Sequence, residues 1–292
     1  MDVILDLTAR NLRLFFRDRL NVFFSLLGAL IVFLLYTLFL ANLQTSSITA
    51  AFPQADEADV RGFVDSWMFG GIVAMTSITT SLGSLSVFVE DAATGRFRDF
   101  LVSPIRRGQL VLGYLLSTVV VALIMTTIVL AVSLAYLYFV DGVALDVFAI
   151  LRTVGWIALA CVAFAALWSF VASFIRTTGA FSALATIVGT VIGFLAGAFI
   201  AVGLFPDAVR NVVNALPFAQ AAMLVRREFT ADTLSTLVGG QQDAIDTLDA
   251  YYGIATFVGD VEVTVPAVVA ILATCAIVFT ALAAWRIRAR IA

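Results

Sequence analysis

The chain alternates between long runs without a charged residue and shorter segments in which the charges collect. Six of the uncharged runs reach about 20 residues, the length that a helix needs to cross the hydrocarbon core of a bilayer. The pattern therefore predicts an all-α integral membrane protein with six transmembrane helices. The expected spans lie at about 20–41, 66–89, 110–138, 153–175, 178–204 and 264–285.

The remaining segments complete the expected organisation. Residues 1–19 precede a single transmembrane domain, 20–292, which contains a loop at 90–107 and a long segment between spans at 206–262. With both termini in the cytoplasm, 12 of the 17 arginines fall on the inner side and 14 of the 20 acids on the outer side. Because positive charge collects on the cytoplasmic side of membrane proteins, we predict that both termini are cytoplasmic.

The composition excludes an ordinary soluble enzyme, a disordered chain and a nucleic-acid-binding protein. Hydrophobic residues make up 62% of the chain and charged residues 13%, whereas about a quarter of a soluble domain is charged. All 17 basic residues are arginine, and histidine is absent. The chain therefore cannot supply a P-loop lysine, a Ser–His–Asp triad or a histidine-ligated metal site. We expect no catalytic residue, metal or cofactor in it, so that another polypeptide must power any ATP-driven work. The lack of lysine points to a GC-rich, bacterial source, and hence to a bacterial plasma membrane.

Residues 1–19 predict an amphipathic helix that lies along the inner leaflet. Its charged face carries Asp6, Arg10, Arg13 and Arg17. Its apolar face carries Leu5, Ala9, Leu12, Phe16 and Leu20. Two interpretations remain open for this helix: an anchor to lipid headgroups, or an anchor that also belongs to a docking surface for a cytoplasmic partner.

The loop at 90–107 predicts a short helix with an apolar face and a charged rim. Phe97, Phe100 and Leu101 form the apolar face, and Ser103-Pro104 ends the helix because proline disfavours helical backbone in the residue before it. A short amphipathic helix of this kind suits a groove on a partner protein. The alternative is a solvated loop that follows the charge distribution of the inner side.

Two motifs resemble those of ABC-2-type permeases, the membrane subunits of a large class of ATP-binding-cassette exporters. The first resembles that family's first cytoplasmic loop and comprises Glu90, Gly95, Phe97, Leu101, Ser103, Pro104 and Arg106, followed by Gly113. The second resembles a pattern after the fifth span and comprises Pro206, Asn214, Leu216, Pro217, Phe218 and Arg226. In the family an asparagine directly precedes the second proline, whereas here Leu216 does.

The resemblance implies the ABC-2 fold of type V exporters. It also implies two permeases, identical or paralogous, each docked on a separate ATPase that holds ATP and Mg²⁺. The residues that it assigns to ATPase coupling are Glu90, Gly95, Phe97, Phe100, Leu101, Ser103, Pro104, Arg106, Arg107, Arg10, Arg13 and Arg17. Glu90 is expected to form a structural contact at the membrane edge, with Arg17 or Arg19 as candidate partners, and not to act as a catalytic base.

Small residues recur every four positions along the fifth expected span, at Ala185, Gly189, Gly193, Gly197 and Ala201. Such a ridge lets two helices approach closely in lipid. It predicts either packing within one subunit or a contact near the subunit interface that lines the transport path, as the resemblance suggests.

The second expected span is the most polar one, and Ser77, Thr80, Ser81 and Ser84 share a face. Their hydroxyl groups either bond to carbonyls of their own helix or form a weakly polar wall of a path. No expected span contains an ionisable residue other than cysteine or tyrosine, which argues against a proton-coupled antiporter. A hydrophobic or amphipathic cargo would suit such a path.

The outer segment begins with Pro206, Asn214, Pro217 and Phe218, and we expect short re-entrant helices there that dip into the outer leaflet. Its later part, 230–260, is acidic and predicts a solvated cap, with Tyr251, Tyr252 and Phe257 seated on the membrane surface. The acidic spacing does not match an EF-hand calcium loop.

The sequence thus predicts a permease for ATP-driven export of a drug, a lipid or a peptide-like substrate. Its expected partners are an ATP-binding-cassette ATPase, a second permease and membrane lipid, without nucleic acid. A polysaccharide or lipid-linked glycan exporter permease is the alternative within the class. A scaffold or sensor subunit without its own transport path is the alternative outside it.

Overall fold

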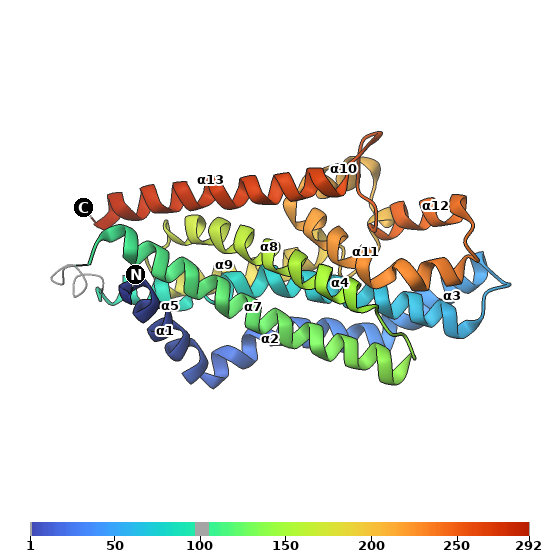
Figure 1. Ribbon diagram of the computed structural model, residues 1–292, viewed down its shortest axis with the longest axis horizontal. Coiled ribbons are helices and arrows are strands. Elements are labelled where there is room, and N and C mark those ends of the chain that lie inside the picture. Colours follow the sequence, from blue (N-terminus) through green and yellow to red (C-terminus); the bar gives the residue numbers. More distant parts are fainter. Residues whose placement is uncertain (1, 97–104, 292) are drawn as a thin grey trace.

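The computed structural model describes residues 2–96 and 105–291 and shows an elongated bundle of helices (Figure 1). Six helical segments are long and apolar enough to cross a membrane, which confirms the predicted all-α, six-span architecture. These segments are Arg19–Ala51, Glu57–Ala93, Gly108–Val140, Val147–Ala172, Thr178–Leu195 and Val265–Arg286. Both chain termini lie at one end of the bundle, which we call the terminal end (Figure 1). The other end is the far end.

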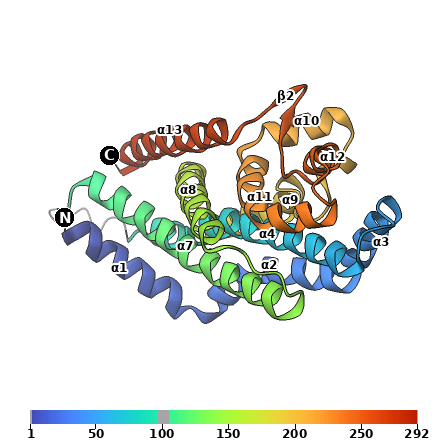
Figure 2. The ribbon, with the colours of Figure 1, turned by 45° about the vertical axis from the view of Figure 1, so that its right-hand side comes forward.

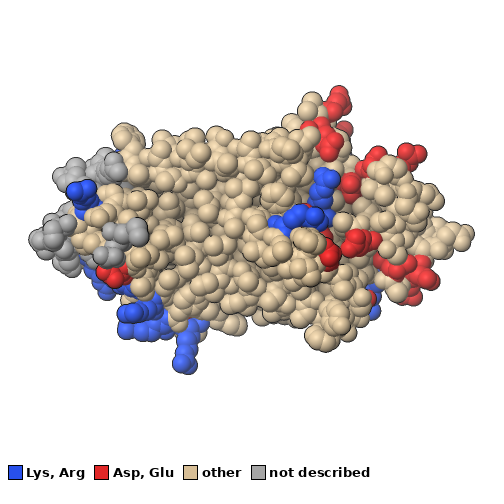
Figure 3. All heavy atoms as spheres, viewed as in Figure 1, with Lys and Arg blue, Asp and Glu red and all other residues tan. Residues whose placement is uncertain are grey.

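Charge separates along the long axis of the molecule. Basic side chains collect over the terminal end, and most acidic side chains lie over the far end together with a few basic ones, with an uncharged stretch between the two groups (Figure 3). This pattern fits a helix bundle that presents an apolar surface to lipid and its charges to water. The placement of the terminal end in the cytoplasm stays a prediction.

Helix α1 (Asp2–Arg17) lies across the terminal end and packs against α7 (Arg107–Val140) (Figure 2). The first span follows it as one continuous rod made of α2 (Arg19–Leu35), a π-helical turn η1 (Tyr36–Leu40) and α3 (Ala41–Ala51). The rod ends ten residues beyond the expected limit, because neither proline nor glycine occurs between residue 41 and Pro53. Its last part is polar and lies at the far end.

Helix α4 (Glu57–Gly83) is the centre of the bundle, and α5 (Ser86–Ala93) continues it to the terminal end. It contacts α2, α7, α8 (Val147–Ala172) and α11 (Pro217–Leu237). Helix α4 begins nine residues before the expected span, and Asp65 is buried within it. The helix therefore carries a buried carboxylate directly before the expected span, which itself contains no charged residue.

Helix α9 (Thr178–Leu195) ends well before the expected limit at residue 204, so the predicted length of the fifth span is wrong. Gly197 adopts a left-handed backbone with a φ of 64°, which reverses the chain. The N–H groups of Ala198 and Phe199 both donate to the carbonyl oxygen of Gly193. A single turn of 3₁₀-helix, η2 (Val202–Leu204), follows this reversal.

The far end is closed by the segment after α9. Helix α10 (Asp207–Ala215) leads into α11, which inserts between α4 and α8. Helix α12 (Gln242–Tyr252) and a two-stranded antiparallel hairpin, β1 (Phe257–Val258) and β2 (Val261–Glu262), precede α13 (Val265–Ile291). Tyr252 is buried against Trp67, and not seated on the membrane surface as expected, because the indole Nε1 donates to its carbonyl oxygen at 2.7 Å.

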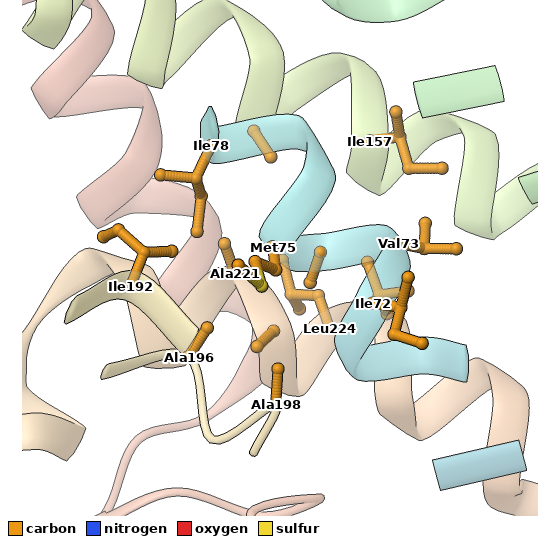
Figure 4. Close-up of a cluster of buried hydrophobic side chains, with 14 of the residues drawn as sticks. Ile72, Val73, Met75, Ile78, Ile157, Ile192, Ala196, Ala198, Ala221 and Leu224 are labelled. Atoms are coloured by element: carbon orange, nitrogen blue, oxygen red, sulfur yellow. The ribbon is translucent and has the colours of Figure 1, made fainter. Parts of the chain in front are cut away.

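The hydrophobic core lies where α4, α8, α9 and α11 meet. Figure 4 shows Ile72, Met75 and Ile78 of α4 facing small or branched side chains of the neighbouring elements. The small residues Ala196, Ala198 and Ala221 let the turn after α9 and helix α11 approach α4 closely. This core holds α9 and the turn that follows it against α4.

Candidate functional site

A buried aspartate on α5 fastens three segments together at the terminal end. Asp91 Oδ2 accepts hydrogen bonds from Arg10 Nη1 at 2.7 Å and from the Tyr114 hydroxyl at 2.5 Å. Its Oδ1 accepts from Arg10 Nη2 at 3.2 Å and from Arg96 Nη1 at 3.1 Å. The Asp91 side chain is 1% exposed, so two guanidinium groups and a hydroxyl compensate a buried anion. The hydrogen bond to Asp91 raises the pKa of Arg10.

Helix α1 is seated directly on α7. A Cβ added at Gly113 would stand 2.8 Å from the Cβ of Leu7, so only glycine fits this approach. Asn11 Nδ2 donates to Ser117 Oγ at 3.2 Å, and the Thr8 hydroxyl donates to the Gly113 carbonyl at 3.3 Å. The helix therefore has a third face that the sequence analysis missed, one that packs against protein.

Apart from Arg10, which contacts Asp91, and Glu90, which contacts Arg96, the predicted ATPase-coupling residues fall into three groups. Five of them lie outside the described residues: Phe97, Phe100, Leu101, Ser103 and Pro104. Arg13 and Arg17 are exposed on α1, and Gly95 turns the chain in a left-handed conformation. Arg106 and Arg107 stand at the start of α7, where the Arg106 N–H donates to Gln109 Oε1 at 3.0 Å.

The expected partner of Glu90 is corrected by the structure. Its carboxylate lies 3.4 Å from Arg96, and not beside Arg17 or Arg19. Successive residues of a helix point about 100° apart, so Asp91 turns into the bundle while Glu90 stays exposed. Asp91, with Arg10 turned inward toward it, is the residue that the sequence analysis missed, and its only signal was its adjacency to Glu90.

A groove of about 730 Å³ opens between α2, α4 and α9. Its polar lining consists of hydroxyl groups and one amide, from Asn21, Ser25, Thr79, Ser86, Ser182, Thr186 and Thr190. The rest is apolar and includes Phe24, Ile31 and Met75, with Phe199 beyond the last turns of α9. None of the described residues that line it is charged.

The predicted polar wall on the second span does not line this groove. Ser77, Thr80 and Ser81 are fully buried, and Ser84 nearly so. Each hydroxyl donates to a backbone carbonyl three or four residues earlier in the chain. The Ser77 hydroxyl donates to the Ala74 carbonyl at 2.7 Å, and the Ser84 hydroxyl donates to the Ser81 carbonyl at 3.0 Å. These four residues therefore lie away from the groove, and their place on a transport path stays a prediction. Thr79, on the neighbouring face of α4, contributes to the groove instead.

The small-residue ridge of the fifth span is interrupted because α9 ends before Gly197 and Ala201. Gly189 lines the groove and has open space beside its Cα, whereas Gly193 contacts the ring of Phe199 from its own segment. The close approach at Gly193 is thus internal to this chain. A role for Gly189 at a subunit interface stays a prediction.

The outer motif organises the far end. Pro206 precedes α10, and Pro217 is the first residue of α11, where proline needs no N–H partner. Asn214 Nδ2 donates to the Phe257 carbonyl at 2.8 Å and holds the hairpin. Phe218 stacks on Phe164 of α8 with 5.3 Å between ring centroids.

Arg226 of α11 is buried at the junction of α4, the turn after α9 and the end of α12. Its Nη2 donates to the Gly197 carbonyl at 2.6 Å, and its guanidinium carbon lies 5.3 Å from the ring centroid of Trp67. Gly70, Gly71 and Gly197 leave room for the side chain. The sequence analysis named Arg226 only as part of the motif after the fifth span, and only this cluster of distant glycines could have indicated its burial.

Among the described residues, no group of three or more histidine, cysteine, aspartate or glutamate side chains is arranged to hold a metal ion. In a comparison with known protein families, residues 3–228 match the model of the ABC-2 type transporter family. Comparison with curated proteins gives no match.

Proposed function

The chain belongs to the ABC-2 type transporter family, and on that basis we propose that it is the permease of an exporter for a hydrophobic or amphipathic substrate. The family places it among the multi-pass membrane subunits of ABC transporters, which associate with an ATP-binding-cassette ATPase. We propose an assembly of two permease copies, identical or paralogous, with two separate ATPases. The proposed location is a bacterial plasma membrane.

The uncharged groove between α2, α4 and α9 is the observation that supports this substrate class. A charged cargo would lose its hydration there without a counter-charge from the described lining. Hydroxyl groups spaced among apolar side chains can instead accommodate a lipid-like or drug-like molecule with a few polar atoms. A drug, a lipid or a hydrophobic peptide fits this lining better than a polyanionic glycan.

The same groove supports the proposed pairing of two permeases. Ile187, Val191 and Phe194 are exposed large apolar side chains on α9, next to the groove. A second copy that covered this face would turn the open groove into an enclosed path. Gly189, which has open space beside its Cα, permits the close approach of another helix at that point.

The contacts of Asp91 support coupling to an ATPase at the terminal end. Arg96 lies at the start of the loop 96–106, Arg10 lies on α1, and Tyr114 lies on α7. A partner that docks on this loop and on the exposed Arg13 and Arg17 would therefore act on α1 and α7 together. ATP-driven movement of the partner would reach the spans through these contacts.

A pull-down from detergent-solubilised membranes tests the docking. Phe97, Phe100 and Leu101 are changed together to Asp, and co-purification of an ATPase is compared with the wild-type protein. A matched control changes Thr236, Gln242 and Thr247, which are exposed at the far end, to Asp. We expect the wild type and the control to retain the ATPase and the loop variant to lose it. Equal recovery with all three proteins would reject docking at the loop.

A pair of glycine substitutions tests the path. Gly189→Trp fills the groove, whereas Gly155→Trp adds the same side chain to an exposed position of α8 with open space around it. The readout is ATP-dependent movement of a fluorescent phospholipid analogue in vesicles that hold the permease with its co-purified ATPase. We expect the first variant alone to lose transport. Unchanged transport in Gly189→Trp would place the path elsewhere.

A further inference from the structure

Two carboxyl groups are buried side by side at the far end, one on α4 and one at the end of α7. The side chains of Asp65 and Asp141 are 6% and 2% exposed, and their carboxyl groups lie within hydrogen-bonding reach of each other. Arg61 Nε lies 3.9 Å from Asp65 Oδ2 and 3.6 Å from Asp141 Oδ1. The carboxyl groups of Asp65 and Asp141 thus share a single nearby guanidinium group, that of Arg61.

The arginine does not fully compensate the two acids. Arg61 is 60% exposed, so water screens its charge. Both oxygens of Asp141 are buried and have no hydrogen-bond partner among the described residues. The other titratable groups that face the pair are two phenols, Tyr136 of α7 and Tyr36 of η1, which are neutral near pH 7.

Two adjacent buried carboxylates repel each other, and a shared proton removes this cost. When one carboxyl carries the proton, its O–H donates to an oxygen of the other, which gives one of the two orphaned Asp141 oxygens a partner. Burial raises the pKa of the Asp141 carboxyl above its usual range, in agreement with proton retention. The shared proton alone is enough to join the two carboxyl groups by a hydrogen bond.

The pair stands where the end of α7 is fastened to α4. The Asp141 and Val143 N–H groups both donate to the Leu137 carbonyl, at 3.3 and 2.9 Å, which folds the chain back toward α4. There the Val143 side chain packs against Gly62, where an added Cβ would lie 3.1 Å from Val143 Cγ2. Separation of the two carboxyl groups would release this end of α7 and the connection to α8.

We propose that Asp65 and Asp141 hold one proton between them and form a pH-dependent latch between the far ends of α4 and α7. The latch is closed when the proton is bound. A carboxyl whose pKa is raised on folding stabilises the closed state at low pH, and this contribution is lost as the pH rises through the raised value. The latch makes the far end responsive to the proton concentration on its own side of the membrane, which is a property beyond transport.

Asparagine variants separate this latch from an ordinary ion pair. Asp141→Asn keeps the shape of a protonated aspartate, and its amide can donate to the Asp65 carboxylate at every pH. Asp65→Asn does the same from α4. Asp56→Asn, at the exposed start of α4, makes the same change in charge without touching the pair and is the matched control.

The distance between the two helix ends is the first readout, measured by pulsed electron paramagnetic resonance in lipid nanodiscs. Spin labels replace Ala58 of α4 and Phe139 of α7, which are both exposed, after Cys161 and Cys275 are changed to Ala. In the wild type we expect one short distance at about pH 5 and a longer, broader population at about pH 9. Each Asn variant should keep the short distance throughout, and the Asp56→Asn control should behave as the wild type.

Infrared spectroscopy of the unlabelled protein gives a second readout that does not need the labels. All proteins in this measurement also carry Asp249→Asn, because burial raises the pKa of the Asp249 carboxyl to about 6 and this group would give a band of its own. In this background a protonated carboxyl band should disappear as the pH rises. It should be missing in both Asn variants of the pair but present in the Asp56→Asn control. A wild-type distance that is independent of pH would overturn the latch. So would a carboxyl band that persists in both Asn variants, or a pH-dependent distance in either of them.

Discussion

Arg226 and Gly197 are joined by a 2.6 Å hydrogen bond from the guanidinium Nη2 to the carbonyl oxygen. The bond links the middle of α11 to the left-handed turn that ends α9. Phe199, two residues after that turn, reaches the groove, so Arg226 helps to set the position of a groove residue that it does not contact.

The glycines around Arg226 should tolerate no side chain. A Cβ at Gly71 would stand 2.8 Å from Arg226 Nη2, and the guanidinium has no free space to move into. We expect Gly71→Ala to lower the free energy of unfolding by about 1–3 kcal/mol, the usual cost of overpacking. Thermal unfolding in detergent measures the effect. Gly155→Ala, on an exposed face with open space, is the control and should not be destabilised.

Loss of the Asp91 carboxylate should weaken the terminal end. Asp91→Asn removes the acceptor that Arg10, Arg96 and Tyr114 share, and because both arginines are partly exposed to water we expect a loss of about 1–3 kcal/mol. Glu90→Gln removes a carboxylate that is 57% exposed and should cost under about 1 kcal/mol. Chemical unfolding of both variants checks the contrast. Equal losses would mean that Asp91 does not fasten the three segments.

The seat of α1 on α7 should depend on the lack of a side chain at Gly113. Gly113→Val places a branched side chain against Leu7, so we expect α1 to detach while the six spans stay inserted. Limited proteolysis of residues 1–19 reports the detachment. Gly179→Val, at a position with open space near the start of α9, should leave α1 as protected as in the wild type.

The far end should gain stability in mild acid through Asp249. Burial, with help from the charges of Asp246 and Glu262, raises the pKa of this carboxyl to about 6, although Arg227 opposes the shift. The folded state thus holds the proton more tightly than the unfolded chain, whose aspartates titrate near pH 4. The stabilisation is complete below about pH 4 and is lost as the pH rises through about 6.

Asp249→Asn should remove this pH dependence. The melting temperature of the wild type should rise relative to that of the variant as the pH is lowered from about 7 to about 4.5. Asp232→Asn, at an exposed position of α11, is the control and should follow the wild type. Parallel melting curves of the wild type and Asp249→Asn across this range would show that Asp249 does not gain a proton on folding.

The hydropathy pattern was enough to predict the spans because transfer of apolar residues into lipid depends mainly on composition. It could not predict the end of α9, because residues 178–204 are uncharged on both sides of the turn at Gly197. The chain reverses there through a left-handed glycine and contacts from α11, which are tertiary features. Uncharged sequence can continue after a helix has ended.

Burial of charge was the least predictable part of the site. Asp65, Asp91 and Arg226 lie at the edges of apolar runs or in a long loop, where a charge is ordinarily taken to face water. Each is buried because residues distant in sequence surround it. The family resemblance pointed to the right region of the terminal end, yet it directed attention to Glu90 instead of its neighbour.

Helix α7 joins both ends of the molecule through a single uninterrupted run of 34 residues. At about 1.5 Å per residue it is a rod of about 50 Å. One tip carries Gly113 and Tyr114 under α1, and the other stands next to Asp141. Because both tips belong to one continuous helix, a tilt of α7 imposed at the tip near α1 would also move the tip near Asp141 and load its contacts with α4.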